Sequence, residues 1–299
     1  MSGGNAVTTH GISKRYGRET ALDGVNLRVP EGAVYVLVGA NGAGKSTTLK
    51  VLMNLERADA GTAEIHGLDT VRRGPEARAQ VGYVPERPDH GYRWMMCRGL
   101  LKHVAAYYPT WDHPYADRLS LAFGLRLDRQ VATLSKGESR RLQLVLALGH
   151  RPPVLLLDEP TDGLDPVVRS RTLSLLAEHL ADTPTTILIS THHIHELESL
   201  ADHVGVLRDG RLVAQMSRDE LQRTVGRYRV EIPMGWQATR ELQVAGVRAN
   251  GVREAQWTLV GDQRELIDRL TLAGAHVREV QPLALADAAL AFLEHEVTR

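Results

Sequence analysis

Eight residues near the start of the chain restrict its fold more than any other feature. The segment Gly39-Ala-Asn-Gly-Ala-Gly-Lys-Ser46 matches the pattern G-x-x-x-x-G-K-[ST] completely. It lies between the apolar run Ala33–Val38 and the helical pattern Ser46–Asn54. In such a loop the backbone N–H groups face an anion, and the start of the following helix adds positive potential. A chance glycine turn is the alternative, but the flanking strand and helix argue against it.

The matched loop predicts a nucleotide site with defined roles. Lys45 is expected to reach the β- and γ-phosphates, and Ser46 is expected to ligate Mg²⁺. The remaining expected phosphate contacts are Gly39, Asn41, Gly42, Ala43, Gly44 and Thr47.

Strand and helix patterns alternate over the first 217 residues. Continuous apolar runs at 33–38 and 154–157 are typical of buried parallel strands, and a strand is also expected at Thr185–Ser190. Between about residues 90 and 150 the pattern becomes helical. We therefore predict an α/β core with a mostly parallel sheet and a helical insertion at about 90–150. Further strands are expected at Ala6–Tyr16, Gly24–Val29 and Thr62–His66, helices at Val167–Leu180 and Ile194–Leu200, and a hairpin at 204–215.

The pattern changes after Ser217. Three short strands and two helices, Asp262–Leu272 and Ala284–Glu294, are expected in the remainder. We therefore predict a division into residues 1–217, which carry the nucleotide motifs, and a small α/β domain at 218–299. A chain cut near Ser217 is expected to bind nucleotide, provided that the cut exposes no core.

Composition excludes several classes of protein. The 36 Lys+Arg and 36 Asp+Glu of the 299 residues give a net charge of zero, whereas a protein that binds nucleic acid mainly through phosphates carries a basic excess. No apolar run approaches the ~18 residues of a membrane helix, and Met1–His10 does not resemble a signal peptide. The single cysteine, Cys97, cannot form an intrachain disulfide and fits a reducing compartment. We therefore expect a cytoplasmic location.

A second motif supports the nucleotide site. The apolar run Val154–Leu157 ends in Asp158-Glu159. Asp158 is expected to hold Mg²⁺ through water, and Glu159, one residue further, can polarise an attacking water as a general base. The motif is weak alone because many buried strands end in Asp, and it becomes strong beside the phosphate loop.

Here the chain resembles the ATP-binding cassette (ABC) ATPases over about residues 6–217. Leu134-Ser-Lys-Gly-Glu138 is similar to the family signature, and Gly163-Leu-Asp165 to the loop that crosses the family's dimer interface. The resemblance implies a P-loop core with an antiparallel β portion, and a head-to-tail homodimer whose two sites each bind ATP and Mg²⁺. In the implied dimer, the nucleotide of one copy is contacted across the interface by four residues of the other copy: Ser135, Gly137, Glu138 and Asp165. His192 matches the switch histidine near the γ-phosphate.

Tyr16 matches the residue that stacks on adenine, and a core aromatic is the alternative. Glu86 stands where the family usually has Gln, and it is expected to reach Mg²⁺ or water. The signature departs from its commonest form at Lys136 and Glu138.

The apolar segment 91–97 suits a contact with a membrane subunit or simple packing of the insertion by Trp94 and Met96, and both alternatives stay open.

The expected function is that of the ATP-hydrolysing subunit of an exporter-type ABC transporter. Closure of the dimer would drive separate transmembrane permease subunits, and the chain would lie peripherally on the inner face of the membrane. The region 218–299 resembles the C-terminal extension of exporter-type subunits, with a role in dimer stability, in regulation or only in packing. A soluble ABC ATPase acting on nucleic acid or ribosomes is the alternative. A P-loop kinase does not fit Ser135–Glu138 and His192.

Overall fold

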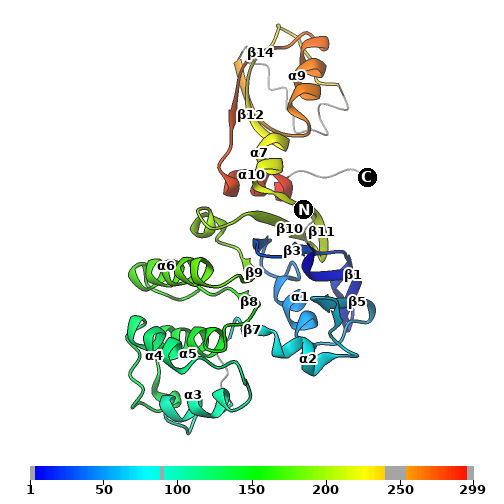
Figure 1. Ribbon diagram of the computed structural model, residues 1–299. Coiled ribbons are helices and arrows are strands. Elements are labelled where there is room, and N and C mark those ends of the chain that lie inside the picture. The colour runs from blue at the N-terminus through cyan, green and yellow to red at the C-terminus, as the bar shows by residue number, and fades with distance from the viewer. Residues whose placement is uncertain (1–3, 88–90, 240–253, 295–299) are drawn as a thin grey trace.

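A parallel sheet forms the centre of the computed structural model, which describes residues 4–87, 91–239 and 254–294 (Figure 1). Its six strands have the order β11-β10-β4-β9-β8-β7; every neighbouring pair is parallel except β10 with β11. All residues of β4, β8 and β9 are buried, as the apolar runs of β4 and β8 predict. The predicted mostly parallel core is confirmed. The strands are β4 (Val34–Val38), β7 (Val81–Val84), β8 (Val154–Asp158), β9 (Thr186–Thr191), β10 (His203–Arg208) and β11 (Arg211–Ser217).

An antiparallel sheet lies beside this core (Figure 1). The helices α1 (Lys45–Leu52) and α2 (Gly74–Ala79) lie on the same side of the molecule as this sheet. The predicted strand Gly24–Val29 is wrong, because the chain leaves one strand at Val25 and begins the next at Arg28. Between them the Asn26 side chain accepts from the Gly11 N–H at 2.8 Å and donates to the Gly24 carbonyl at 3.0 Å, which replaces the strand ladder. The strands are β1 (Asn5–Tyr16), β2 (Glu19–Val25), β3 (Arg28–Pro30), β5 (Ala60–Ile65) and β6 (Leu68–Asp69).

The helical insertion contains α3 (Cys97–Ala105), α4 (His113–Ala122) and α5 (Lys136–Leu148), with a 3-10 turn at Val131–Thr133. Its predicted start near residue 90 lies outside the described residues. The side chain of Asp112 caps α4, accepting from the Tyr115 N–H. The helix α6 (Pro166–Asp182) follows β8, and the helix predicted at 194–200 is only a 3-10 turn, Ile194–Leu197.

The C-terminal region has its own three-stranded sheet, β13-β12-β14. Tyr228, Trp257 and Leu270 are among the side chains of its separate core. The helix α7 at its start was not predicted, although Ser217 and Glu220 form the capping box that marks it. The elements are α7 (Arg218–Thr224), β12 (Val225–Glu231), β13 (Glu254–Val260), α9 (Gln263–Leu272), β14 (His276–Pro282) and α10 (Leu285–Glu294).

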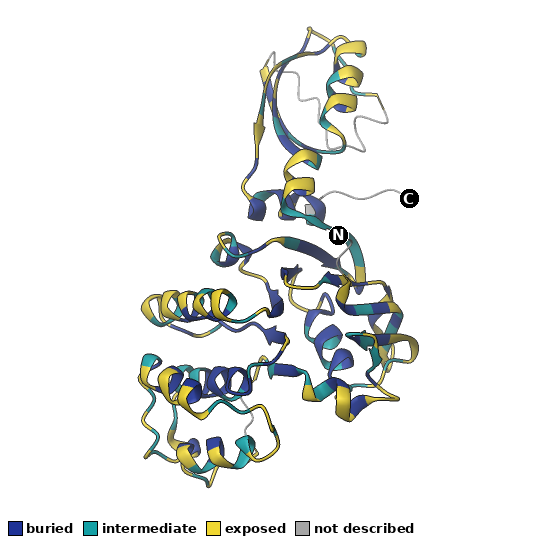
Figure 2. Ribbon diagram, viewed as in Figure 1, coloured by how far each residue is buried: buried dark blue, intermediate teal, exposed yellow. Residues whose placement is uncertain are grey.

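The last helix, α10, packs against the nucleotide-binding part of the chain (Figure 2). Leu285 and Phe292 belong to the same apolar cluster as Val204 and Val206 of β10. A cut near Ser217 therefore exposes core, and the condition attached to the truncation prediction is not met. The division at 217/218 stays a prediction.

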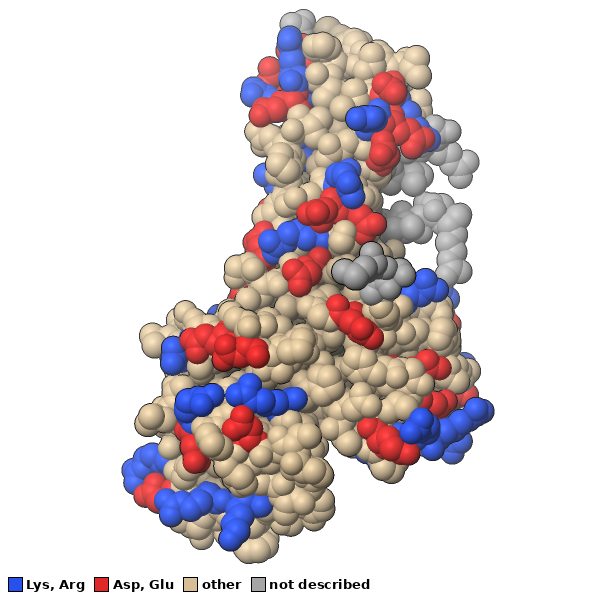
Figure 3. Space-filling view, in the orientation of Figure 1, with Lys and Arg blue, Asp and Glu red and all other residues tan. Residues whose placement is uncertain are grey.

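The surface carries both charges. On the face in Figure 3, Lys and Arg lie among Asp and Glu over all parts of the described chain. None of the helices in the described ranges has the length and apolar character needed to span a bilayer.

Candidate functional site

The loop between β4 and α1 has the backbone that its glycines predict. Gly42 and Gly44 have φ values of 83° and 105°, a region that disfavours other residues. A Cβ on Gly44 would lie 2.4 Å from the Ala21 carbonyl oxygen. The first turn of α1 has no acidic residue, and none of the described side chains caps the helix. The free N–H groups and helix dipole therefore favour an anion at this end.

Lys45 is held inside this loop. Its side chain is 5% exposed, and its ammonium donates to the Gly39 carbonyl at 2.8 Å and the Ala40 carbonyl at 3.2 Å. The same nitrogen lies 3.6 Å from Oε1 of Glu159. One buried positive charge therefore stands between the phosphate loop and the carboxylate at the end of β8.

Asp158 ends β8 directly beneath the loop. Its Oδ1 accepts from the Ser46 hydroxyl at 3.0 Å and from the Ser190 hydroxyl of β9. Its Oδ2 is buried and has no hydrogen-bond partner in the described structure. Burial raises the pKa of Asp158, the two serine hydroxyls oppose this, and the negative charges of Glu86 and Glu159 add to it. The site thus presents a free, buried carboxylate oxygen beside a serine hydroxyl.

Glu159 and His192 form a pair across the ends of β8 and β9. Nδ1 of His192 lies 2.9 Å from Oε1 of Glu159. Glu159 has a φ of 47°, which costs about 1–3 kcal/mol for a residue other than glycine. Its N–H donates to the Ser190 carbonyl at 3.0 Å, which holds the strained residue in place.

These groups line a cavity of about 670 Å³. It contains most of the predicted site residues: Tyr16, Asn41, Gly42, Gly44, Lys45, Ser46, Thr47, Glu86, Glu159 and His192. Tyr16 is 43% exposed at its edge, with the Lys14 ammonium 5.3 Å from the ring centre. An exposed ring at a cavity edge is unlike a core aromatic and is free to stack on a base.

Three lining residues were not predicted. Glu19 and Ala21 reach the cavity from β2, and no sequence signal marks them. Asp162 also lines it, and its position three residues after Glu159 was an available signal. Gly39, Ala43 and Asp158 are not part of the lining; Asp158 joins the site through Ser46.

The signature residues lie outside this cavity. Ser135 caps α5, and the capping box with Glu138 is complete. Glu138 also pairs with Arg129 at 2.9 Å, so its carboxylate serves the helix start. The Lys136 ammonium lies 2.9 Å from Oδ2 of Asp162. Asp165 caps α6, accepting from the Val167 and Val168 N–H groups. The predicted nucleotide contacts of Ser135, Gly137, Glu138 and Asp165 stay predictions.

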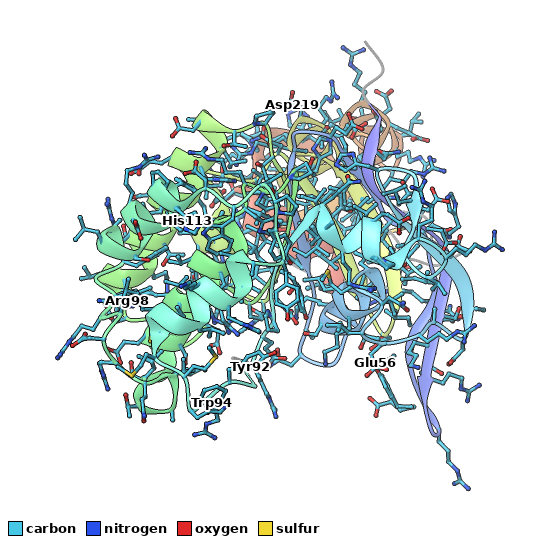
Figure 4. The ribbon with its side chains drawn as sticks, turned by 60° about the horizontal axis from the view of Figure 1, so that its bottom comes forward. Glu56, Tyr92, Trp94, Arg98, His113 and Asp219 are labelled. Carbon is cyan, nitrogen blue, oxygen red and sulfur yellow. The ribbon has the colours of Figure 1, made fainter. Side chains whose placement is uncertain are left out.

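The segment before α3 has an exposed apolar surface. Trp94 is 73% exposed and Met96 43%, so the packing alternative does not account for Trp94. Tyr92 and Trp94 lie together at the rim of the molecule in Figure 4.

Within the described residues no group of three or more His, Cys, Asp and Glu is arranged to hold a metal.

Comparisons with known proteins agree with this geometry. The family model for ABC transporters matches residues 22–162. The daunorubicin resistance ATP-binding protein DrrA3 of Streptomyces coeruleorubidus is 34% identical over 287 residues, covering 92% of this chain and 88% of that protein. The bacitracin transport ATP-binding protein BcrA of Bacillus licheniformis is 32% identical over 224 residues, covering 74% and 73%.

Solved structures share the fold. One described as the ATP-binding subunit of an ABC transporter is 30% identical, covers 73% of this chain and 92% of its own, and has a TM-score of 0.66. A dimeric bacterial cassette, MJ0796, is 21% identical, covers 71% of this chain and 98% of its own, and has a TM-score of 0.64. The chain therefore belongs to the ABC transporter family and is one of its ATP-binding, ATP-hydrolysing subunits.

Proposed function

We propose that this chain powers an exporter as a homodimer of ATPase subunits bound to separate transmembrane permease subunits. The observation that carries the proposal is the single cavity that unites Tyr16, the phosphate loop, Glu159 and His192. Export is supported by relatives named for daunorubicin resistance and for Nod factor export; the latter, from Burkholderia orbicola, is 39% identical over 214 residues. The chain would then lie on the inner face of the membrane, held there by its permease.

Each residue has a defined part in hydrolysis. Tyr16 stacks on adenine, and Lys45 with the loop N–H groups binds the phosphates. Glu159 orients the water and accepts its proton as oxygen attacks the γ-phosphorus and the bond to the β-phosphate oxygen breaks. Nδ1 of His192 lies 2.9 Å from Oε1 of Glu159 and holds it from the side, and His192 would contact the γ-phosphate of bound ATP. Catalysis rests on positioning and charge stabilisation.

The site fits Mg²⁺. The ion prefers oxygen ligands and usually takes only one or two carboxylates besides substrate phosphates and water. Oδ2 of Asp158 is buried and has no hydrogen-bond partner in the described structure, and Oδ1 of the same residue lies 3.0 Å from the Ser46 hydroxyl. Glu86 lines the cavity. These three residues would hold the ion, which supplies charge neutralisation on the phosphates when bound.

Dimer formation follows from the position of the signature. Ser135 and Gly137 lie outside the cavity of their own chain, so their contact with a nucleotide requires a second copy placed head to tail. Asp165, at the start of α6, would lie at that interface. Residues 218–239 and 254–294 would form the small second domain with a stabilising or regulatory role, apart from α10, whose packing joins it to the first.

The exposed segment before α3 is the proposed permease contact. Trp94 and Met96 are exposed, whereas Cys97 beside them is buried, so the apolar side chains are directed outwards at a fixed point. Protein interfaces are enriched in Trp, Met and Tyr.

The test is the variant Glu159→Gln, which keeps the cavity but removes the base. We expect it to bind MgATP without turnover and to run as a dimer in gel filtration with MgATP and as a monomer without it. Adding Lys45→Ala should abolish the nucleotide-dependent dimer, which is the control. A Glu159→Gln chain that stays monomeric at saturating MgATP would contradict the composite site.

The alternative role on nucleic acid or ribosomes gains no support. The relatives reported above are named for resistance, transport or export.

A further inference from the structure

Arg140 is a charged residue buried without an obvious structural need. It lies on α5, five residues after Ser135, and is 0% exposed. Among the described residues whose side chains are fully buried, Arg140 has the largest volume. Burying a guanidinium is costly unless its donors are satisfied, so its partners indicate what the charge is kept for.

Its partners are two consecutive carbonyls. Nη1 donates to the Pro85 carbonyl and Nη2 to the Glu86 carbonyl, while Gln143 on the same helix lies 3.3 Å from Nη1. The planar fork of an arginine matches two acceptors side by side. The two carbonyls belong to the peptide groups before and after the Glu86 Cα, so holding both restrains the backbone on each side of Glu86 and therefore the direction in which its side chain leaves the backbone.

In the described part of the chain, the β7–β8 ladder does not extend over this segment. The strand β7 ends at Val84, and proline has no N–H to donate. Upstream, α5 lies directly on β7, since a Cβ on Gly82 would stand 2.3 Å from the Ala147 carbonyl oxygen. The helix thus contacts the strand at Gly82 and holds the chain beyond it through Arg140.

The charge of Arg140 lies near the acidic residues of the site, although its side chain does not line the cavity. None of the carboxylates in the described part of the chain forms an ion pair with it at 4.0 Å or less. Burial lowers its pKa, and the opposing negative charges are those of Asp162, Asp158, Glu86 and Glu159. A guanidinium stays protonated in proteins, so a positive charge lies behind the carboxylates of the site.

We propose that Arg140 is a positioning residue that links the signature helix to Glu86, so that the orientation of α5 decides where the Glu86 carboxylate stands in the nucleotide cavity. The inference rests on the proposed roles of the signature and of Glu86. Any rotation of α5 either carries Glu86 with it or breaks both hydrogen bonds of the fork. Occupation of the signature by the nucleotide of a second copy is thereby transmitted to the metal side of the chain's own site.

The test measures binding in full-length chains that carry Glu159→Gln, so that hydrolysis does not interfere. ATP affinity is determined by calorimetry in excess Mg²⁺ and again in EDTA, and the ratio of the two gives the gain due to Mg²⁺. We expect Arg140→Met to lower this gain roughly tenfold, because a small misplacement of a ligating group is enough. Affinity in EDTA should not change, since Tyr16 and the phosphate loop are untouched.

Two further variants identify the route. Glu86→Ala should lower the gain as much as Arg140→Met, and the double variant should lose no more than either, because both remove the same interaction. Arg141→Met is the matched control. Arg141 is the next residue of α5, and its side chain donates to the Phe123 and Gly137 carbonyls, so the gain should be kept.

Several results would overturn the proposal. One is an unchanged gain in Arg140→Met, and another is a double variant whose loss is the product of the two single losses. A fall in affinity of equal size in EDTA and in Mg²⁺, with a lower melting temperature, would show a merely structural role. Full gain in Arg140→Lys would show that charge alone suffices, without the fork. Failure of the wild-type chain to bind and hydrolyse MgATP is a different result, and it concerns the proposed function itself.

Discussion

A buried histidine joins the helical insertion to the core and should make the stability of the chain depend on pH. His179 of α6 is 1% exposed. Its Nδ1 lies 2.7 Å from the hydroxyl of Tyr115 on α4, and its Nε2 lies 3.2 Å from the hydroxyl of Thr185. Thr185 in turn donates to the Pro152 carbonyl. A neutral ring that accepts from Tyr115 and donates to Thr185 satisfies every group in this network.

Protonation disturbs the network. Burial, together with a smaller effect of the positive charge of Arg151, lowers the pKa of His179 to about 4, and the negative charge of Asp182 opposes this. The Arg151 guanidinium lies 4.1 Å from the centre of the Tyr115 ring. In the unfolded chain the group returns to its ordinary value of 6.5. The unfolded state therefore binds more protons between these two values, so stability is present above the unfolded pKa and is lost as the pH falls towards the folded one.

The size of the effect follows from the two values. Linkage gives a loss of about 2 kcal/mol from this one group between about pH 7.5 and about pH 5. For a folding unit of 150–250 residues this corresponds to roughly 4–8 °C in melting temperature. The assay compares melting by circular dichroism at both pH values for the wild type and for His179→Gln, and the variant should show a pH-dependent loss smaller by that amount.

Tyr115→Phe is the control for this prediction. It removes the hydroxyl and should lower stability at both pH values, but it keeps the titrating ring and hence the pH dependence. If His179→Gln and the wild type lose the same stability on acidification, the reasoning from burial is refuted.

The remaining predictions concern the C-terminal region, Trp94 and Glu86. A chain ending at Ser217 should melt at a lower temperature and bind apolar dyes, since losing the burial of each Leu or Phe of α10 costs about 1.5–3 kcal/mol. Deletion of 227–281 with a short linker is possible because Gly226 and Pro282 are paired neighbours, and it should retain the wild-type melting temperature of the core. Equal melting temperatures of the two shortened chains would contradict this. Trp94→Ala should leave the ATPase rate of the isolated chain unchanged but weaken co-purification with the permease. Leu121→Ala, at a side chain 83% exposed, should change neither the ATPase rate nor co-purification, and equal co-purification of the two variants counts against the proposed contact. Glu86→Gln should retain most ATPase activity and Glu86→Ala should lose coupling to transport, and identical transport by all three forms would leave Glu86 without a role.

The nucleotide site was largely predictable because its parts are local. The left-handed Gly44 directly precedes Lys45, which begins α1. Steric and hydrogen-bonding rules act between residues that are so close in the chain. The same holds for Asp158, since an apolar run that ends in a carboxylate brings it to the end of a buried strand. That β4 and β8 lie in one sheet, separated by β9, is decided by packing.

Elements without a strong local pattern were missed or misjudged. The strand β7 is four residues long and contains Gly82, a weak strand former that is required only because α5 passes so close. The helix α10 was predicted correctly as a helix, but its amphipathic pattern cannot specify which apolar surface it covers. It packs on the core near β10 as well as contacting β12 and β13 of the sheet beside it in sequence.

The amino-acid sequence by itself therefore determined the phosphate loop, the carboxylates Asp158 and Glu159, the α/β class and the family. Only the tertiary structure decided that Glu19 and Asp162 line the cavity and that Arg140 holds the carbonyl of Glu86. The physical reason is range. Backbone conformation and helix starts depend on neighbours a few residues apart, whereas a contact across 54 residues depends on how the sheet and the helices pack together.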